Sequence, residues 1–233
     1  MLIGGNGFGN TQYVNSVFTA VIDVATKKIS GYKRTEMEES FIDQFSQRKF
    51  AFTKNNKSGL YPFKMRAFEL SDGTLDIIGG LSRMETDYSG KSVSVRFYAG
   101  SILNVNFTNG KAVMTRIPRI RFTFTPTGQS FYAIQKDNTI IVLYNDIEKN
   151  LQMANDAMPE DSENLKNVVV VAATVKDGNL IRKAIIDERT DNYLAEPHFT
   201  KGITETIYIM PLLQTKGIEK TTGKHKMATV SIQ

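Results

Sequence analysis

The chain has 233 residues, of which 41% are apolar and 23% charged, with a formal net charge of +5 and no cysteine. This composition is ordinary for a globular protein, and the absence of cysteine excludes disulfides, thiolate metal sites and a cysteine nucleophile. The positive charge is spread along the chain, so nucleic acid is not an expected partner. No apolar run is long enough for a membrane span, and Met1-Leu2-Ile3-Gly4-Gly5 lacks the features of a signal peptide, so we expect the natural protein to begin upstream.

Short apolar runs joined by turn residues predict hairpins along most of the chain. Asp72-Gly73, Asn109-Gly110, Asp137-Asn138 and Asp177-Gly178 supply the positive φ angles that tight hairpin turns require. The expected strand pairs are Val17–Val24 with Ile29–Tyr32, Phe63–Leu70 with Thr74–Leu81, Ile102–Phe107 with Ala112–Ile117, Phe131–Gln135 with Thr139–Tyr144, and Val168–Val175 with Leu180–Ile186.

Two segments break the strand pattern and predict short helices. Thr35 and Glu38 have the spacing of a capping box, and Met37, Phe41 and Phe45 follow as an apolar stripe at four-residue steps. A second helix or turn is expected to begin at Asp146, which stands at the capping position.

The distribution of apolar residues over the strand faces indicates how the sheets pack. Val93, Val95 and Phe97 alternate with polar or amphipathic residues, whereas Ile140–Tyr144 and Val168–Ala173 are apolar on both faces. Strands joined by two-residue turns must be antiparallel, and an antiparallel sheet buried on both faces requires neighbouring sheets on both sides.

The fold class predicted from these patterns is all-β: a β-propeller-like array of antiparallel hairpins, with one or two short helices. The pattern corresponds to roughly twelve to fourteen strands, or about three to four blades of four strands, which is at or below the smallest closed propeller. We therefore interpret residues 1–233 as a single propeller-like domain or as the C-terminal part of one.

One candidate site is a group of carboxylates after a predicted strand. Asp187, Glu188 and Asp191 could supply the two acids that a glycosidase needs, with Arg189 holding one of them ionised. The competing interpretation is a solvated loop whose charges neutralise one another.

A second candidate is the arginine-rich run around Arg116, Arg119 and Arg121. Arginines interleaved with apolar residues suit contact with an anionic polymer through forked hydrogen bonds and stacking. The alternative is an outer strand whose wet face carries Arg119 and Arg121.

A third candidate is the corner at Asn145 and Asp146. Their side chains could bind a ligand, or they could cap backbone groups where a strand gives way to a helix. The glycine-rich start has no helix after it, and His198 and His225 lack the spacing of a metal site, so we expect no cofactor and no metal.

Three segments together resemble a known family: Glu69-Leu70-Ser71-Asp72-Gly73, Asn109-Gly110-Lys111 leading into Arg116-Ile117-Pro118, and Tyr144-Asn145-Asp146 with Lys149-Asn150-Leu151. They are similar to uncharacterised, exported, propeller-like proteins of unknown function. The resemblance implies a propeller fold and an extracytoplasmic (periplasmic or secreted) location, and it implies no activity.

The sequence leaves three functional hypotheses open. The first is a non-enzymatic binding or scaffold domain that presents loops to an unknown protein or glycan. The second is a carbohydrate-active enzyme with paired carboxylates on its loops, and the third is binding of an anionic polymer through the arginine-rich strand.

Overall fold

The structure is a computed structural model, and it describes residues 13–45, 51–54, 57–60, 64–90, 92–108, 111–119, 121–123, 130–160, 168–176, 178–187, 193–216 and 220–232. Every strand pairing among these residues is antiparallel, which confirms the all-β class. The strands are β1 (Ser16–Asp23), β2 (Lys28–Glu36), β3 (Ala51–Lys54), β4 (Lys57–Leu60), β5 (Lys64–Glu69), β6 (Leu75–Ser89), β7 (Ser92–Thr108), β8 (Lys111–Ile117), β9 (Arg121–Thr123), β10 (Phe131–Lys136), β11 (Thr139–Ile147), β12 (Val168–Lys176), β13 (Asn179–Asp187), β14 (Tyr193–Ala195), β15 (Lys201–Gly202), β16 (Ile207–Lys216) and β17 (Lys220–Ser231). The helices are α1 (Glu39–Asp43), α2 (Glu148–Leu151) and the 3₁₀ turn η4 (Pro197–Phe199).

The hairpins expected from the turn residues all form. Ile22 lies opposite Ile29, Phe107 opposite Ala112, and Val175 opposite Leu180. The predicted pairing of β5 with β6 and of β10 with β11 is confirmed as well. Local turn chemistry was therefore sufficient to predict which strands pair, although Asn109, Gly110 and Asp177 themselves lie outside the described residues.

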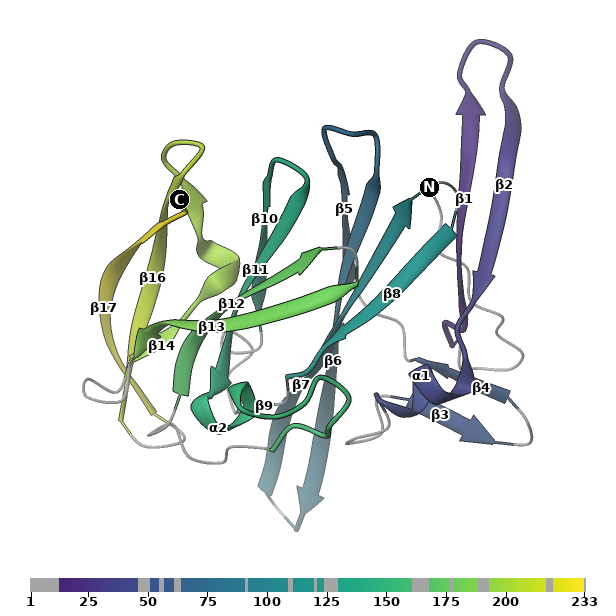
Figure 1. The fold of residues 1–233 in the computed structure, drawn as a ribbon. Coiled ribbons are helices and arrows are strands. Elements are labelled where there is room, and N and C mark those ends of the chain that lie inside the picture. The colour runs from purple at the N-terminus through teal and green to yellow at the C-terminus, as the bar shows by residue number, and fades with distance from the viewer. Residues whose placement is uncertain are drawn as a thin grey trace.

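Three sheets follow one another along the chain and in space (Figure 1). The first sheet has the order β5-β6-β7-β8 with β9 beside β7, and the second has the order β10-β11-β12-β13. In the third sheet β16 is paired with β14, β15 and β17. Each of the first two sheets is a simple meander, so each can be built from consecutive hairpins without a long crossover.

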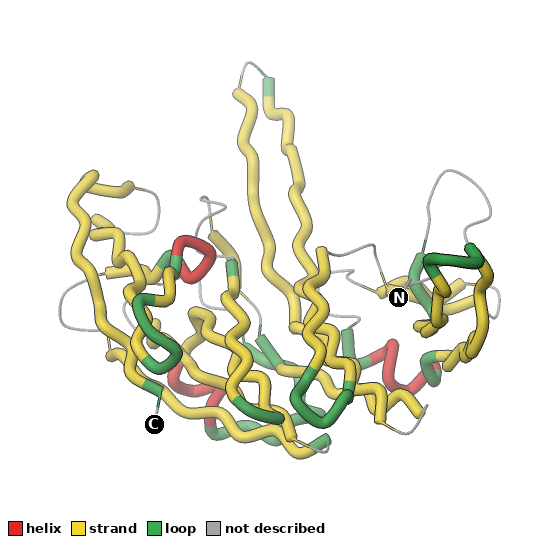
Figure 2. The backbone as a smooth tube through the Cα atoms, turned by 90° about the horizontal axis from the view of Figure 1, so that it is seen from above, coloured by secondary structure: helices red, strands yellow, loops and turns green. Residues whose placement is uncertain are grey.

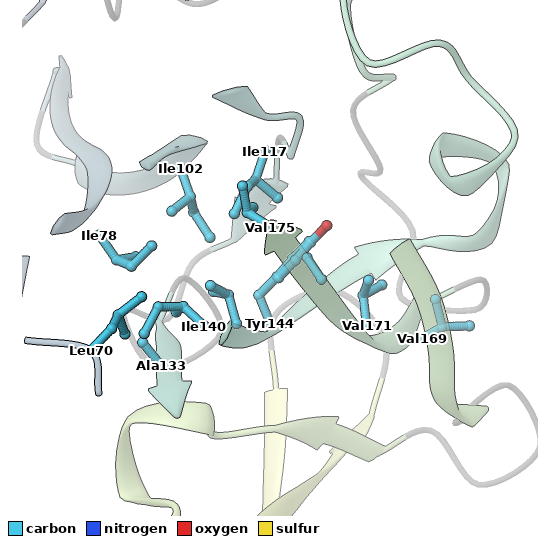
Figure 3. Packing of buried hydrophobic residues seen from close by; sticks show 12 residues of the cluster. Leu70, Ile78, Ile102, Ile117, Ala133, Ile140, Tyr144, Val169, Val171 and Val175 are labelled. Carbon is cyan, nitrogen blue, oxygen red and sulfur yellow. The ribbon is translucent and has the colours of Figure 1, made fainter. Parts of the chain in front are cut away.

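The second sheet is buried on both faces, as its sequence predicts. Ile140, Val142 and Tyr144 of β11 pack against the first sheet, and the intervening Leu143 packs against the third. On β12 the same alternation places Val169 and Val171 toward the first sheet and Val170 toward the third. Figure 3 shows the contact with the first sheet, where Ile140 and Tyr144 lie near Ile78, Ile102 and Ile117. Stacked antiparallel sheets are thus the physical reason for the two-sided apolar pattern.

The other face of the first sheet is covered by the N-terminal part of the chain. Met37, Ile42 and Phe45 pack there against Ile77 and Leu103. Met37 and Phe45 of the predicted stripe are therefore buried, but only Phe41 lies within α1, so the stripe is not carried by one helix, and the capping box is wrong as well. Thr35 remains in β2, opposite Val17, and the single-turn helix α1 begins after Glu38, which makes no side-chain capping bond.

Two hairpins extend away from the stacked sheets. β1 and β2 form an isolated two-stranded sheet that stands apart from the rest at the purple end of the chain (Figure 1). β6 and β7, with 15 and 17 residues, are about three times as long as an average strand, and their far ends project as a long ribbon (Figure 2).

A close contact between sheets occurs at Gly80, where the register between β6 and β7 shifts just before the projecting ribbon. A Cβ at this position would overlap the ring of Phe131 in the second sheet. Glycine is needed here because the backbone of one sheet touches an aromatic side chain of the next.

Among the residues that the structure describes, no helix is long and apolar enough to span a membrane.

Candidate functional site

Arg116, at the end of β8, is a buried tie between three segments. Its side chain is only 3% exposed, and burial lowers its pKa to about 10, so it stays charged at neutral pH. Nη1 donates to the carbonyl of Gln44 at 2.5 Å, and Nη2 donates to the carbonyls of Asn155 and Ala157 at 2.8 and 2.5 Å. The guanidinium therefore joins the end of α1 and the loop after α2 to the first sheet.

Arg119 is buried more deeply still, with 1% of its surface exposed. Nε donates to the carbonyl of Gly100 at 3.2 Å, Nη1 donates to that of Ser130 at 3.1 Å, and the guanidinium lies 5.8 Å from the ring centroid of Tyr144. Burial lowers the pKa of Arg119 to about 10 as well. The expectation that this arginine lies on the wet face of an outer strand was wrong, because it follows β8 and precedes β9 in the gap between two sheets.

These positions bear directly on the anionic-polymer hypothesis. Arg116 and Arg119 are closed off from solvent, and both Nη atoms of Arg116 and Nε and Nη1 of Arg119 donate to backbone carbonyls. Arg121 lies in β9 opposite Ala99, and its side chain is outside the described residues. Any contact with a polymer through this run would therefore depend on Arg121.

Asn145 and Asp146 are buried where β11 ends and α2 begins, and their side chains form hydrogen bonds inside the fold. Asp146 Oδ1 accepts hydrogen bonds from the backbone N–H of Ile147 at 2.9 Å and from Asn150 Nδ2 at 2.7 Å. Asn145 Nδ2 donates to the carbonyl of Ala195 at 2.8 Å, which joins the second sheet to the third. The backbone-capping interpretation is confirmed for Asp146, which bonds to the N–H of Ile147, although Asp146 is not the helix cap, because α2 begins after Ile147.

Asn150 extends the same network to the loop that follows α2. Its Nδ2 donates to the carbonyl of Glu160 at 2.9 Å, and its Oδ1 accepts from the backbone N–H of Glu160 at 2.8 Å. This pair of bonds holds both ends of the segment from 150 to 160 together. Sequence reasoning missed this role, because nothing local indicates that Asn150 pairs with a residue ten positions away.

Asp146, Tyr144 and Arg119 are buried ionisable groups between the first and second sheets, and the partly exposed Arg182 lies close enough to influence them. Burial raises the pKa of Asp146 to about 7, although hydrogen bonds from Asn150 and Ile147 and the charges of Arg119 and Arg182 lower it. Burial, with the nearby carboxylate of Asp146, also raises the pKa of Tyr144. Arg182 donates through Nη2 to the carbonyl of Met153 at 2.7 Å.

This cluster can change its charge near neutral pH inside the fold. Oδ2 of Asp146 is buried and accepts no hydrogen bond from the described residues, so the ionised form is incompletely compensated. The hydrogen bonds of Asp146, Arg119 and Arg182 run to backbone groups and to Asn150, which is the behaviour of a structural network. Among the described residues, no group of three or more His, Asp or Glu side chains is placed to hold a metal ion.

The carboxylate candidates cannot be brought together from the described part of the chain. Asp187 is the last residue of β13, opposite Val169, and its side chain is not described. Glu188 and Asp191 lie outside the described residues. The paired-carboxylate hypothesis therefore stays a prediction.

The structure adds a feature that sequence reasoning did not select: two ribbons with apolar side chains in solvent. On the β1–β2 hairpin the exposed set is Val21, Ile22, Ile29 and Tyr32 in the strands and Val24 in the turn, and on β6 and β7 it is Met84, Tyr88, Val93 and Val95. The alternating pattern of Val93, Val95 and Phe97 was visible in the sequence. Such alternation normally marks a face that packs on a core, and only the tertiary structure shows that this face is open.

In comparisons with known proteins, no protein-family model, no curated protein and no solved structure matches the chain. The resemblance to an exported family therefore stays an expectation.

Proposed function

We propose that this chain is a non-enzymatic binding or scaffold domain for a protein or glycan partner. The observation that carries the proposal is the ribbon formed by β1 and β2, which holds large apolar side chains in solvent. The buried side chains of Arg116, Asn145 and Asn150, in contrast, form hydrogen bonds within the fold. Exposed apolar area of this kind marks interaction sites in soluble proteins.

The β1–β2 ribbon has one apolar and one more polar face. Phe18 and Tyr32 contact each other with ring centroids 5.4 Å apart, and Ile22 lies directly opposite Ile29 farther out. On the other face Asp23 lies opposite Lys28, Thr19 opposite Lys33, and the exposed Val21 opposite Ser30. This is the pattern of a hairpin that packs on a core by one face, and Ile22 and Ile29 are 53% and 64% exposed.

We further propose that the three stacked sheets are blades of an open propeller-like array and that the domain acts outside the cytoplasm. Support for the first point is the succession of three antiparallel sheets packed face to face, as blades are. Support for the second is the family resemblance alone.

The binding proposal is tested by substituting neighbouring positions on opposite faces of β2. Ile29→Lys places a charge on the apolar face, and Ser30→Lys places the same charge on the polar face. The immobilised chain is offered an extract of its source organism and, separately, a glycan array. We expect Ile29→Lys to reduce specific retention at least about tenfold and Ser30→Lys to leave it unchanged.

Two results would contradict the proposal. One is that the wild-type chain retains nothing above a blocked surface in either format. The other is that Ile29→Lys and Ser30→Lys behave alike, which would show that the apolar face is not the recognition surface. Thermal unfolding of both variants checks that the ribbon substitutions leave the stacked sheets intact.

A further inference from the structure

The segment that follows β11 is fastened to itself at both ends, and it is here called the α2 strap (residues 148–160). It consists of α2 and the loop after it, and α2 contacts β11 and β13. Asn150 forms two hydrogen bonds with the backbone of Glu160, at 2.8 and 2.9 Å. Nζ of Lys149 lies 2.6 Å from Oε1 of Glu160. The strap is therefore a closed loop on the surface of the sheets.

The middle of the strap is held by two arginines from the sheets beneath it. Arg116 of β8 donates to the carbonyls of Asn155 and Ala157, and Arg182 of β13 donates to that of Met153. Within the strap, only the side chains of Asn150 and Pro159 are buried. A segment with so little buried apolar surface can open locally while the stacked sheets stay folded.

Asp146 links the strap to the buried ionisable groups between the sheets. Its carboxyl is 1% exposed, and Oδ1 accepts hydrogen bonds from Asn150 Nδ2 and from the N–H of Ile147. Oδ2 is buried and accepts no hydrogen bond from the described residues. A buried carboxylate with one oxygen uncompensated is costly, whereas the protonated carboxyl is tolerated. The closed strap therefore favours the protonated form of Asp146, in agreement with its pKa of about 7.

Ionisation of Asp146 creates a demand for a new donor at Oδ2, and both available donors disturb the strap. Nη1 of Arg182 is buried without an acceptor among the described residues, and the charge of Arg182 acts on Asp146. Nη2 of the same guanidinium holds the carbonyl of Met153, so turning it toward the carboxylate releases that carbonyl. Water is the other donor, and it reaches Oδ2 only if the strap lifts.

We propose that the α2 strap is a pH-operated latch, closed while Asp146 is protonated and released when this carboxyl ionises. Release frees the guanidinium groups of Arg116 and Arg182 from three carbonyls and uncouples the strap from the first and second sheets. The closed form holds a proton that the open form gives up to solvent. Opening therefore becomes easier as the pH rises from 3.8, the ordinary pKa of an aspartate, to about 7.

Other ionisable groups lie on the elements around Asp146. They are Tyr144 in β11, Arg119 after β8, Arg182 in β13, Glu148, Lys149, Asp156 and Glu160 in the strap, and Glu196 and His198 after β14. Arg119 and Arg182 lower the pKa of Asp146 but do not cancel the effect of burial. Burial lowers the pKa of His198 from 6.5. Because His198 stays in place in Asp146→Asn, comparison of that variant with the wild type isolates Asp146.

The test is amide hydrogen exchange of the full chain from pH 5 to 8, with each rate divided by the intrinsic rate of that amide. Hydrogen-bonded N–H groups of the strap report its opening: Gln152, Met153, Ala157 and Glu160. The amides of β12, which is paired on both sides, report global unfolding. We expect the opening constant of the strap to exceed that of β12, to rise roughly fiftyfold between pH 5 and 7, and then to level off.

Two matched substitutions identify the group that controls the latch. Asp146→Asn keeps an acceptor for Asn150 and Ile147, and we expect it to abolish the rise with pH. Asp156→Asn makes the same change at an exposed position of the strap, and the rise should persist.

Three outcomes would overturn the inference. The strap amides could exchange no faster than those of β12, so that no separate opening exists. The rise could persist in Asp146→Asn, or it could disappear in Asp156→Asn as it does in Asp146→Asn. The first comparison needs only the wild-type chain, so it decides the question even if a variant does not fold. The latch is independent of the binding proposal, because the retention assay uses the β1–β2 ribbon.

Discussion

Asp146 makes the stability of this protein depend on pH in a way that one substitution can isolate. Its carboxyl is completely enclosed between two sheets, and its pKa rises from 3.8 to about 7, chiefly through burial. Replacement by asparagine keeps an oxygen that can accept the hydrogen bonds of Ile147 and Asn150 and removes the titrating group. The perturbation is therefore Asp146→Asn.

The direction in which stability changes with pH follows from proton binding. Between pH 4 and 7 the folded state holds a proton on Asp146 that the unfolded chain has released, so this group makes the protein less stable as the pH rises. A shift of about 3 pH units, at about 1.4 kcal/mol for each, amounts to about 4 kcal/mol. The contribution is fully favourable below the unfolded pKa of 3.8 and is lost as the pH passes the folded pKa of about 7.

The assay is urea unfolding of the wild type and Asp146→Asn at half-unit steps from pH 4 to 8. Other groups also titrate, so the informative quantity is the difference in the free energy of unfolding between the two proteins. We expect the wild type to lose about 4 kcal/mol relative to the variant over this range, and Asp137→Asn, in an exposed turn, controls for loss of one negative charge. A difference that is constant across the range, or that changes in the opposite direction, would refute the argument.

The remaining predictions concern packing between segments. Gly80→Ala should destabilise the fold by about 1–3 kcal/mol, because the added Cβ overlaps the ring of Phe131. In a double-mutant cycle, Phe131→Leu should recover part of that loss, and additive effects of the two substitutions would contradict the contact. Arg116→Met should lower the free energy of unfolding in urea by at least about 3 kcal/mol, because three backbone carbonyls lose a charged donor. As a control, Arg66→Met at an exposed position should change it by less than about 1 kcal/mol. Equal effects of the two arginine substitutions would show that the tie between α1, the loop after α2 and the first sheet carries little energy.

Where the sequence-based predictions failed, a non-local partner decided the outcome. Thr35 has the spacing of a helix cap, but it stays in β2 because pairing with Val17 continues the hairpin that starts farther out. The alternating pattern predicts that Arg119 faces solvent. Instead, β8 ends just before it, and its guanidinium lies against the ring of Tyr144. A capping box and an alternating pattern describe local preference only, and tertiary packing overrides them.

By itself the sequence determined the all-β class, the hairpin partners and the stacking of sheets on both faces of β11 and β12. These follow from turn residues that allow one local backbone geometry and from side-chain alternation, both of which act over a few neighbouring positions. The tertiary structure alone decided that Arg116 and Arg119 are buried, that the pKa of Asp146 rises to about 7, and that apolar side chains at the far ends of β6 and β7 are open to solvent. Burial of a side chain depends on what residues far away in the chain place against it, and no local pattern contains that information.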